Sequence, residues 1–425
     1  MGKIFIETYG CTLNNADSDI MGELLATAGH SVHRGLIKQE DSKTYDYVIL
    51  NTCTVKKPTE QKIISKLERL SKFNKNIIVT GCLASASPEL IKKAAPEAKI
   101  LSTKNTTKIL TFINPEYTTS EIYEKPFYVN STGSKNNIIT RIPVSEGCLS
   151  NCSFCETKFA RGPLKSFDEK LILRAISNSV KNGFYEIEIT SQDIGAYGAD
   201  KKTNIAELLS NAILIDGDFK IRVGMLNPEH LHKYLDDLFD VMKNKKVFKF
   251  LHLPIQSGSN KVLKSMKRNY TIEDIKSYFD EVRKKIPAIT IETDVIVGYP
   301  NETREDFKST ESFLLDSKPT ITNISKFWKR PHTSASKMPQ ISINEIKRRS
   351  TQLSRSIRNM QVIEYGKLIG SVEEVVITEN NKGLFSGRDD YYRPIAVLGD
   401  NLSIGDKIRV EIIKSTYACA ISRKV

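Results

Sequence analysis

The chain has 425 residues and carries 63 Lys and Arg against 50 Asp and Glu, which gives a formal net charge of +13. This length allows two or three domains, each with its own core. No apolar run approaches the length of a membrane span, and residues 1–20 lack the apolar centre of a secretory signal. We therefore expect a cytoplasmic protein without a membrane partner, and the excess of positive charge favours a polyanionic partner.

Residues 1–115 alternate short apolar runs with amphipathic stretches. The apolar runs predict three strands, at Lys3–Thr8, Tyr45–Asn51 and Asn76–Thr80. The amphipathic stretches predict three helices, at Asn15–Ala28, Pro58–Ser71 and Pro88–Ala95. Because the strands are apolar along most of their length and are separated by helices, we predict an α/β domain with a parallel sheet covered on both faces.

Each of these three strands is followed directly by a cysteine: Cys11, Cys53 and Cys82. The carboxyl ends of parallel strands meet at one edge, where ligands bind in open α/β sheets. A single such cysteine is more often a small buried apolar residue than a ligand, but three at equivalent strand ends indicate a metal cluster with three cysteine ligands. Asn14 and Asp17 could cap the helix after Cys11, or orient a ligand or a bound sulfur species.

The strand-helix alternation resumes in residues 138–362, after a predicted linker at 116–137 that is rich in Thr, Ser, Asn, Tyr and Lys. Six strands are predicted here, at Ile138–Val144, Tyr185–Ser191, Phe219–Gly224, Phe248–Pro254, Ile289–Val297 and Thr320–Phe327. Six strand-helix units predict a partial (β/α)6 barrel, with its chemistry at the carboxyl ends of the strands.

A C-x3-C-x2-C run, made of Cys148, Cys152 and Cys155, follows the first of these six strands. Three thiolates on one loop can hold three irons of a [4Fe-4S] cluster and leave the fourth iron open. A structural zinc site would need a fourth ligand, and disulfides are disfavoured by seven cysteines in a chain expected in the cytoplasm. With Phe154 directly before the last cysteine, the run resembles the radical S-adenosylmethionine (SAM) family, in which the open iron chelates SAM.

Further polar residues follow other strands at the same predicted edge. Ser191 and Gln192 follow the second strand, Gln256 follows the fourth, and Asp294 lies in the fifth. Singly, such residues could be helix caps or turn residues. Together they could supply donors and acceptors for the ribose, adenine and amino-acid ends of SAM.

Two regions are candidates for contact with nucleic acid. A basic stretch over residues 326–358 contains Lys329, Arg330, Lys347, Arg348 and Arg349, and could alternatively be a solvated helix face. Residues 363–425 read as short strands separated by glycines, which predicts a small all-β barrel of the size of an RNA-binding module. This region is close to neutral, so an RNA contact there would need a local patch that includes Arg388 and Arg393.

The motifs around the six cysteines resemble the methylthiotransferase family of radical SAM enzymes over nearly the whole chain. They include Asn51-Thr52-Cys53-Thr54, Ala160-Arg161-Gly162 and Thr190-Ser191-Gln192-Asp193. Val223 to Pro228 and Phe327 to Ser336 most resemble the archaeal and eukaryotic branch. The resemblance implies a TRAM-like barrel at residues 363–425. Asn301 and His332 depart from the usual glycines and put loop geometry in doubt.

The resemblance also implies an activity, the 2-methylthiolation of N6-threonylcarbamoyladenosine at tRNA position 37. Cys148, Cys152 and Cys155 would hold the cluster that cleaves SAM to a 5′-deoxyadenosyl radical, which removes hydrogen from carbon 2 of the base. The cluster on Cys11, Cys53 and Cys82 would carry a sulfur that a second SAM methylates. A one-electron reductant of the flavodoxin or ferredoxin type and a sulfur donor are implied, and we expect a monomer.

Three alternatives stay open at this point. The same six ligands could serve sulfur insertion into another tRNA adenosine or a ribosomal protein residue. A non-enzymatic iron-sulfur RNA-binding protein would bind RNA without cleaving SAM. A zinc-stabilised RNA-binding protein would contain no iron.

Overall fold

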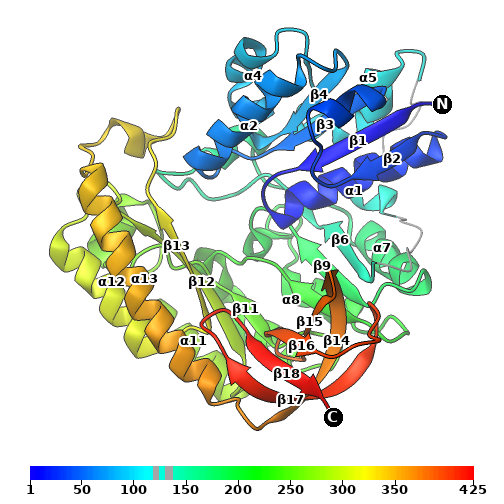
Figure 1. Ribbon diagram of the computed structural model, residues 1–425. Coiled ribbons are helices and arrows are strands. Elements are labelled where there is room, and N and C mark those ends of the chain that lie inside the picture. Colours follow the sequence, from blue (N-terminus) through cyan, green and yellow to red (C-terminus); the bar gives the residue numbers. More distant parts are fainter. Residues whose placement is uncertain (118–123, 130–136) are drawn as a thin grey trace.

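The computed structural model describes residues 1–117, 124–129 and 137–425, which form three bodies (Figure 1). An α/β domain comes first, a partial barrel of parallel strands follows, and a small closed β-barrel ends the chain. Most of the predicted linker lies outside the described residues. Its described part contains the short 3-10 helix Lys125–Tyr128. Within the described residues, no helix has the length and apolar character needed to cross a membrane.

The N-terminal domain contains a five-stranded parallel sheet in the order β2-β1-β3-β4-β5. Its strands are β1 (Lys3–Thr8), β2 (Ser31–Arg34), β3 (Tyr47–Thr52), β4 (Ile77–Gly81) and β5 (Lys99–Ile100). Its helices are α1 (Thr12–Thr27), α2 (Lys57–Leu70), α3 (Cys82–Ala86), α4 (Pro88–Ala94) and α5 (Ile109–Ile113). The predicted parallel sheet is confirmed. The two edge strands were not predicted, because they are short and mostly exposed.

Alternation along the central strands explains why helices cover both faces of this sheet. Ile49 and Ile78 pack in one apolar cluster with residues of α1 and α5. Leu50 and Val79, the next residues along the same strands, pack in a second cluster with residues of α2 and α4. Successive side chains of a strand point to opposite faces, so both faces of this sheet are buried.

The middle of the chain forms the partial barrel from six parallel strands in chain order. They are β6 (Ile139–Pro143), β9 (Glu186–Thr190), β10 (Lys220–Val223), β11 (Phe250–His252), β12 (Thr290–Val297) and β13 (Ile321–Lys326). A bridge between Ile221 and Val247 joins the two three-stranded halves. A two-stranded hairpin of β7 (Ser145–Glu146) and β8 (Lys165–Ser166) flanks the cysteine-rich loop. The predicted (β/α)6 arrangement is confirmed, although β11 is shorter than expected.

Helices surround the outside of this partial barrel (Figure 1). They are α7 (Glu169–Lys181), α8 (Ile205–Ala212), α9 (Leu235–Val241), α10 (Asn260–Ser265), α11 (Ile272–Lys285), α12 (Arg304–Ser317) and α13 (Ile343–Gly366). Capping boxes begin α11 and α12, where Thr271 pairs with Asp274 and Thr303 pairs with Asp306. The long helix α13 lies against α12 and β13 through an apolar face that includes Leu353.

The C-terminal body is a closed barrel in the order β14-β15-β16-β18-β17. Its strands are β14 (Val372–Asn381), β15 (Leu384–Arg388), β16 (Pro394–Leu398), β17 (Lys407–Ser415) and β18 (Ala420–Lys424). Inward residues such as Val375, Phe385 and Val410 form its core. Closure removes the exposed strand edges that would otherwise favour aggregation. The predicted small all-β barrel is therefore confirmed.

Candidate active site

Cys11, Cys53 and Cys82, here called the first trio, lie at one edge of the N-terminal sheet. They follow β1, β3 and β4, which are adjacent strands of that sheet. Cys53 and Cys82 are buried, whereas Cys11 is exposed. Burial raises the pKa of the Cys82 thiol to about 12; Arg161 opposes this rise, whereas Cys11 and Cys53 contribute to it. Thiolates at this edge of the sheet need positive charge nearby.

Asn14 ties together the loops that carry the first trio. Its Nδ2 donates to the carbonyl oxygens of Tyr9, at 2.8 Å, and Thr52, at 2.9 Å, which lie just before Cys11 and Cys53 in the chain. Its Oδ1 accepts a hydrogen bond from Arg161. The alternative that Asn14 caps the helix is wrong, because Cys11 itself occupies the N-cap position of α1.

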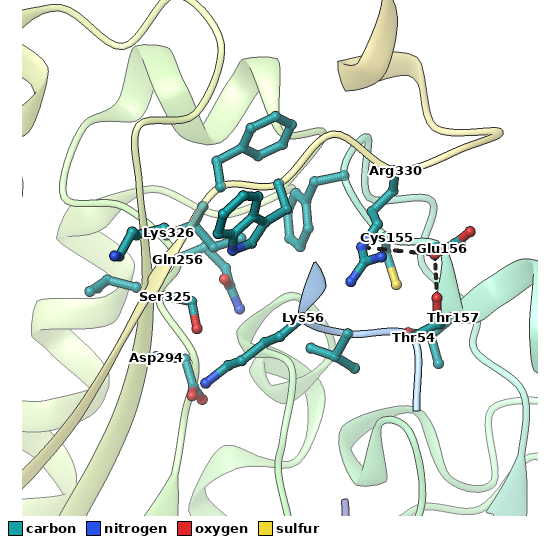
Figure 2. A pocket seen from close by; sticks show the side chains of 16 residues that line it. Thr54, Lys56, Cys155, Glu156, Thr157, Gln256, Asp294, Ser325, Lys326 and Arg330 are labelled. Atoms are coloured by element: carbon teal, nitrogen blue, oxygen red, sulfur yellow. Dashed lines mark hydrogen bonds and ion pairs between the residues drawn. The ribbon is translucent and has the colours of Figure 1, made fainter. Parts of the chain in front are cut away.

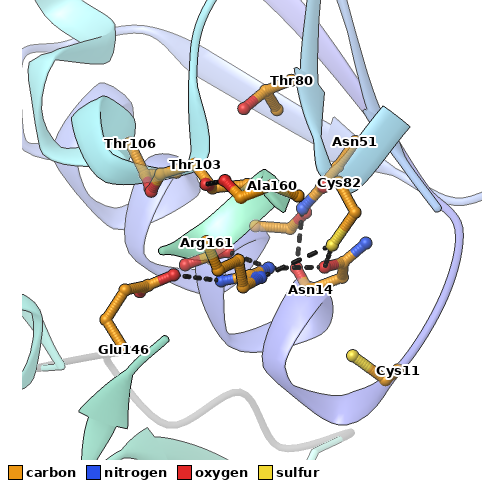
Figure 3. Close-up of polar contacts among 12 residues, drawn as sticks. Cys11, Asn14, Asn51, Thr80, Cys82, Thr103, Thr106, Glu146, Ala160 and Arg161 are labelled. Atoms are coloured by element: carbon orange, nitrogen blue, oxygen red, sulfur yellow. Dashed lines mark hydrogen bonds and ion pairs between the residues drawn. The ribbon is translucent and has the colours of Figure 1, made fainter. Parts of the chain in front are cut away.

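Arg161 crosses from the barrel domain to the first trio and is fully buried. Its Nε donates to the Cys82 sulfur at 3.5 Å, and its Nη2 donates to Asn14 Oδ1 at 2.6 Å and to Asp17 Oδ2 at 2.8 Å (Figure 3). Its Nη1 donates to Glu146 at 2.7 Å. The guanidinium therefore supplies positive charge to the first trio, and Asp17 pairs with Arg161 and does not cap the helix.

Lys125 completes the same buried network from the segment that was predicted as linker. Its ammonium lies 2.6 Å from both Asp17 and Glu146. The two cations hold the pKa of the Glu146 carboxyl below its usual range, despite its burial. The partners of Lys125 and Arg161 are far away in sequence, so pattern alone did not assign either a role. In the sequence, Arg161 was noted only as part of the Ala160-Arg161-Gly162 motif.

Cys148, Cys152 and Cys155, here called the second trio, lie on the loop between β7 and the short helix α6 (Thr157–Arg161). Gly147 begins this loop with φ of +73°, and a Cβ there would meet the Pro163 carbonyl oxygen at 1.9 Å, so only glycine fits. The pKa of Cys148 is raised to about 12 by burial and also by negative charge on Asp193 and the other two cysteines.

A second buried arginine serves this trio. Arg268 Nη1 donates to the Cys152 sulfur at 3.0 Å, and its Nε donates to Tyr270. The Ser153 hydroxyl shares a hydrogen bond of 2.8 Å with Tyr299, which fixes the loop between the second and third cysteines. Each trio thus has one sulfur that accepts from a buried guanidinium, which is the compensation that cluster thiolates need.

The donor sets fit two iron-sulfur clusters, each with three cysteine ligands and one iron left open. Soft thiolates without histidine or carboxylate among them suit such clusters. No three His, Cys, Asp or Glu side chains of the described residues converge closely enough to hold a single metal ion.

The residues expected to contact SAM fall into two groups. Phe154, Gln256 and Asp294 line a pocket of about 220 Å³ together with Cys155 (Figure 2). Asp294 Oδ2 lies 2.6 Å from His252 Nε2. Ser191 and Gln192 do not line this pocket, and the Ser191 hydroxyl accepts from the backbone of Asp193 instead.

Three of the arginines expected to bind RNA are buried in ion pairs instead. Arg330 pairs with Glu60, Arg349 with Glu302 at 2.7 Å, and Arg393 with Asp389. Each of these three residues is less than a tenth exposed, so they are not surface cations, and their contact with RNA stays a prediction. A run of charge in a sequence does not show which of its members face inward.

The other basic residues that were expected to contact RNA are exposed or half-buried. Lys329, Lys347 and Arg348 are exposed, and Arg348 pairs with Glu345 on the same helix. Arg388 is half-buried and lies over the ring of Tyr392.

Two family models match this chain. Residues 3–102 match the Uncharacterized protein family UPF0004, and residues 142–314 match the Radical SAM superfamily. These segments correspond to the N-terminal sheet with the first trio and to the partial barrel with the second.

Similar proteins occur in archaea and in eukaryotes. A "Probable threonylcarbamoyladenosine tRNA methylthiotransferase" of Pyrococcus abyssi is 37% identical and covers 90% of this chain and 90% of its own length. A protein of the same name from Methanothermobacter thermautotrophicus is 35% identical and covers 98% and 99%. The "Threonylcarbamoyladenosine tRNA methylthiotransferase" of Homo sapiens is 31% identical over 97% of this chain and 72% of its own length.

The fold is also similar to solved radical SAM structures. TsrM from Kitasatospora setae, a radical S-adenosylmethionine methyltransferase, superposes with a TM-score of 0.56 at 13% identity, over 79% of this chain and 75% of that one. At this identity the likeness concerns the fold alone. The relatives carry the assignment further: the chain belongs to the threonylcarbamoyladenosine tRNA methylthiotransferase family of radical SAM enzymes.

Proposed function

We propose that this enzyme converts N6-threonylcarbamoyladenosine at position 37 of tRNA to its 2-methylthio derivative. One observation carries the proposal: two cysteine trios lie on either side of one domain interface, and Arg161 connects them. Arg161 ends the helix that begins two residues after Cys155, and its side chain donates to Cys82. A radical site and a sulfur-carrying site must be close to each other for sulfur transfer to one carbon atom.

The side chains of this chain have separable tasks in that reaction. When bound, two [4Fe-4S] clusters and SAM would supply the one-electron and methyl-transfer chemistry that acid–base side chains cannot provide at an unactivated C–H bond. The first and second trios would hold the clusters. Arg161 and Arg268 would offset the negative charge on the thiolates, and Asn14 and Asp17 would keep Arg161 in place. Phe154, Gln256 and Asp294 would contact SAM.

The tRNA and the protein partners follow from the same proposal. Exposed Lys329, Lys347 and Arg348 would contact tRNA phosphates, and Arg388 could do so from the C-terminal barrel. A flavodoxin or ferredoxin would deliver electrons, and a separate donor would renew the sulfur. The enzyme would act as a monomer in the cytoplasm.

An anaerobic experiment tests the proposal. The protein is reconstituted, its iron and sulfide are counted, and it is incubated with SAM, dithionite and tRNA that bears threonylcarbamoyladenosine. We expect about eight irons per chain, because each [4Fe-4S] cluster holds four, and a 2-methylthio nucleoside by mass spectrometry. Cys419→Ala is the matched control, since Cys419 lies outside both trios and should leave the iron content unchanged.

Three other outcomes would contradict the proposal in different ways. Eight irons with 5′-deoxyadenosine but without the methylthio product would mean a different substrate. RNA binding with iron but without SAM cleavage would favour the non-enzymatic alternative. A preparation that takes up zinc and no iron would remove the radical chemistry altogether.

A further inference from the structure

The 220 Å³ pocket beside Cys155 is built by both large domains. The loop Thr54–Lys56 follows Cys53 of the first trio, and residues 154–157 contain Cys155 of the second. The segment Phe327–Arg330 follows β13 and closes a further side with Trp328, the single tryptophan of the chain. The pocket therefore borders loops of both trios, where a base that reacts with radical and sulfur would have to lie.

Arg330 lines this pocket and has two buried donors that make no hydrogen bond. Its side chain is only 3% exposed, and its Nη1 donates to Glu60. Its Nε and Nη2 make no hydrogen bond, and Nε has only a long ion-pair contact of 3.9 Å with Glu156 Oε2 (Figure 2). Leaving buried charged donors unpaired is costly, so their free edge is suited to an acceptor from a ligand.

That free edge has a specific chemical preference. Nε and Nη2 lie side by side on the guanidinium and can donate two parallel hydrogen bonds to the two oxygens of one carboxylate. A neutral ring nitrogen or hydroxyl would use only one of these donors. The geometry of the unpaired edge therefore favours a carboxylate.

The charge around the pocket also favours an anion. Lys56 lines it and has no ion pair with any described residue. The nearby carboxylates already have partners. Glu60 pairs with both Arg330 and Lys57, and Asp294 lies against His252.

We infer that Arg330 and Lys56, here called the carboxylate subsite, bind the carboxylate of the threonylcarbamoyl group and so select the modified adenosine over plain adenosine. The inference rests on the proposed function. Trp328, on the same pocket wall, offers a face on which the purine can stack. SAM also carries a carboxylate, and the two sources are separated by the test below.

The test is a comparison of two anticodon stem-loop RNAs that differ only at position 37, one with threonylcarbamoyladenosine and one with adenosine. Their dissociation constants are measured by fluorescence anisotropy with the anaerobically reconstituted protein, without SAM. We expect the intact protein to prefer the modified RNA. Lys56→Met and Arg330→Lys should each reduce this preference about tenfold, the effect of one charge-assisted hydrogen bond. Lys56 is exposed, so its replacement should not disturb folding.

Lys329→Met is the matched control, because Lys329 is adjacent and exposed but does not line the pocket. It should weaken binding of both RNAs equally and leave their ratio unchanged. An unchanged ratio in the Lys56 and Arg330 variants would overturn the inference alone. Loss of SAM affinity in equilibrium dialysis, with the RNA ratio retained, would assign the subsite to SAM. An intact protein without any preference would also overturn the inference, whereas absence of the methylthio product in the earlier experiment would overturn the proposed function.

Discussion

Arg268 and Arg161 each bring a buried guanidinium to a single sulfur of one trio. Hydrogen bonds to cluster sulfurs and nearby positive charge stabilise the reduced, more negative state of a cluster. Each arginine should therefore raise the reduction potential of the cluster beside it. The two contacts differ in length, 3.0 Å for Arg268 and 3.5 Å for Arg161, so the effect should be larger at the second trio.

The first prediction concerns Arg268→Met. Removing the charge and the donor should lower the reduction potential of the cluster on the second trio by about 60 mV, which is a tenfold change in a one-electron equilibrium. A redox titration followed by electron paramagnetic resonance measures this value. Lys264→Met, an exposed change on α10, is the control and should leave the potential unchanged. A potential that does not move in the Arg268 variant would contradict the argument.

At the scale of single elements, β9 carries a buried acid against the C-terminal barrel. Glu186 lies near Glu188 on the same strand and accepts a hydrogen bond of 2.7 Å from the Tyr392 hydroxyl, in the loop between β15 and β16. Burial, and next the charge of Glu188, raise the pKa of Glu186 to about 7, although Arg222 and Arg388 lie close enough to oppose this. The folded state therefore prefers Glu186 protonated.

The second prediction follows from the sign of that shift. The unfolded chain ionises Glu186 near pH 4.5, whereas the folded chain does so near pH 7, so the free energy of unfolding should fall as the pH rises through this interval. Glu186→Gln should remove that fall and stabilise the protein at pH 8 by on the order of 3 kcal/mol. Urea unfolding at several pH values measures it. Asp216→Asn, an exposed change, should keep the profile of the intact protein.

Helix α13 separates exposed from buried cations of the same charged run. Lys347 and Arg348 face solvent, whereas Arg349 is held by Glu302 and Glu345. Since two exposed cations can neutralise two phosphates, the third prediction is that Lys347→Met with Arg348→Met reduces the salt slope of tRNA binding by about two. Filter binding across a salt series gives the slope. The same double change at Lys276 and Lys284 on α11 should have no effect if α13 contacts tRNA.

At the scale of the whole molecule, loss of one cysteine from the first trio should affect the reaction differently from loss of one cysteine from the second trio. The fourth prediction is that Cys148→Ala abolishes formation of 5′-deoxyadenosine, whereas Cys11→Ala retains it and stops only methylthio transfer. Cys11 is suited to this test because it is exposed and makes no hydrogen bond to Arg161, unlike Cys82. Chromatography of the SAM products measures both. An equal loss of 5′-deoxyadenosine in the two variants would refute separate roles for the trios.

The sequence predicted the sheet, the partial barrel and the positions of both trios, because periodicity gives the strands and each trio lies beyond strand ends. It could not predict the buried network, since Arg161 and Asp17 are 144 positions apart in the chain. It also assigned Arg330 and Arg349 to the surface, because composition does not show that Glu60 and Glu302 lie opposite them. Pairing across domains depends on tertiary packing, which local patterns do not encode.

The short helix α6 has a consequence for how this chain can change in length. It begins two residues after Cys155 and ends at Arg161, and Gly162 follows it with φ of +84°. One inserted residue would turn the end of the helix by about 100° and advance it by about 1.5 Å, which would point the guanidinium away from Cys82. The number of residues between Cys155 and Gly162 therefore determines where the Arg161 side chain lies. Insertions in this segment should be far less tolerated than in the surface loops of the same domain.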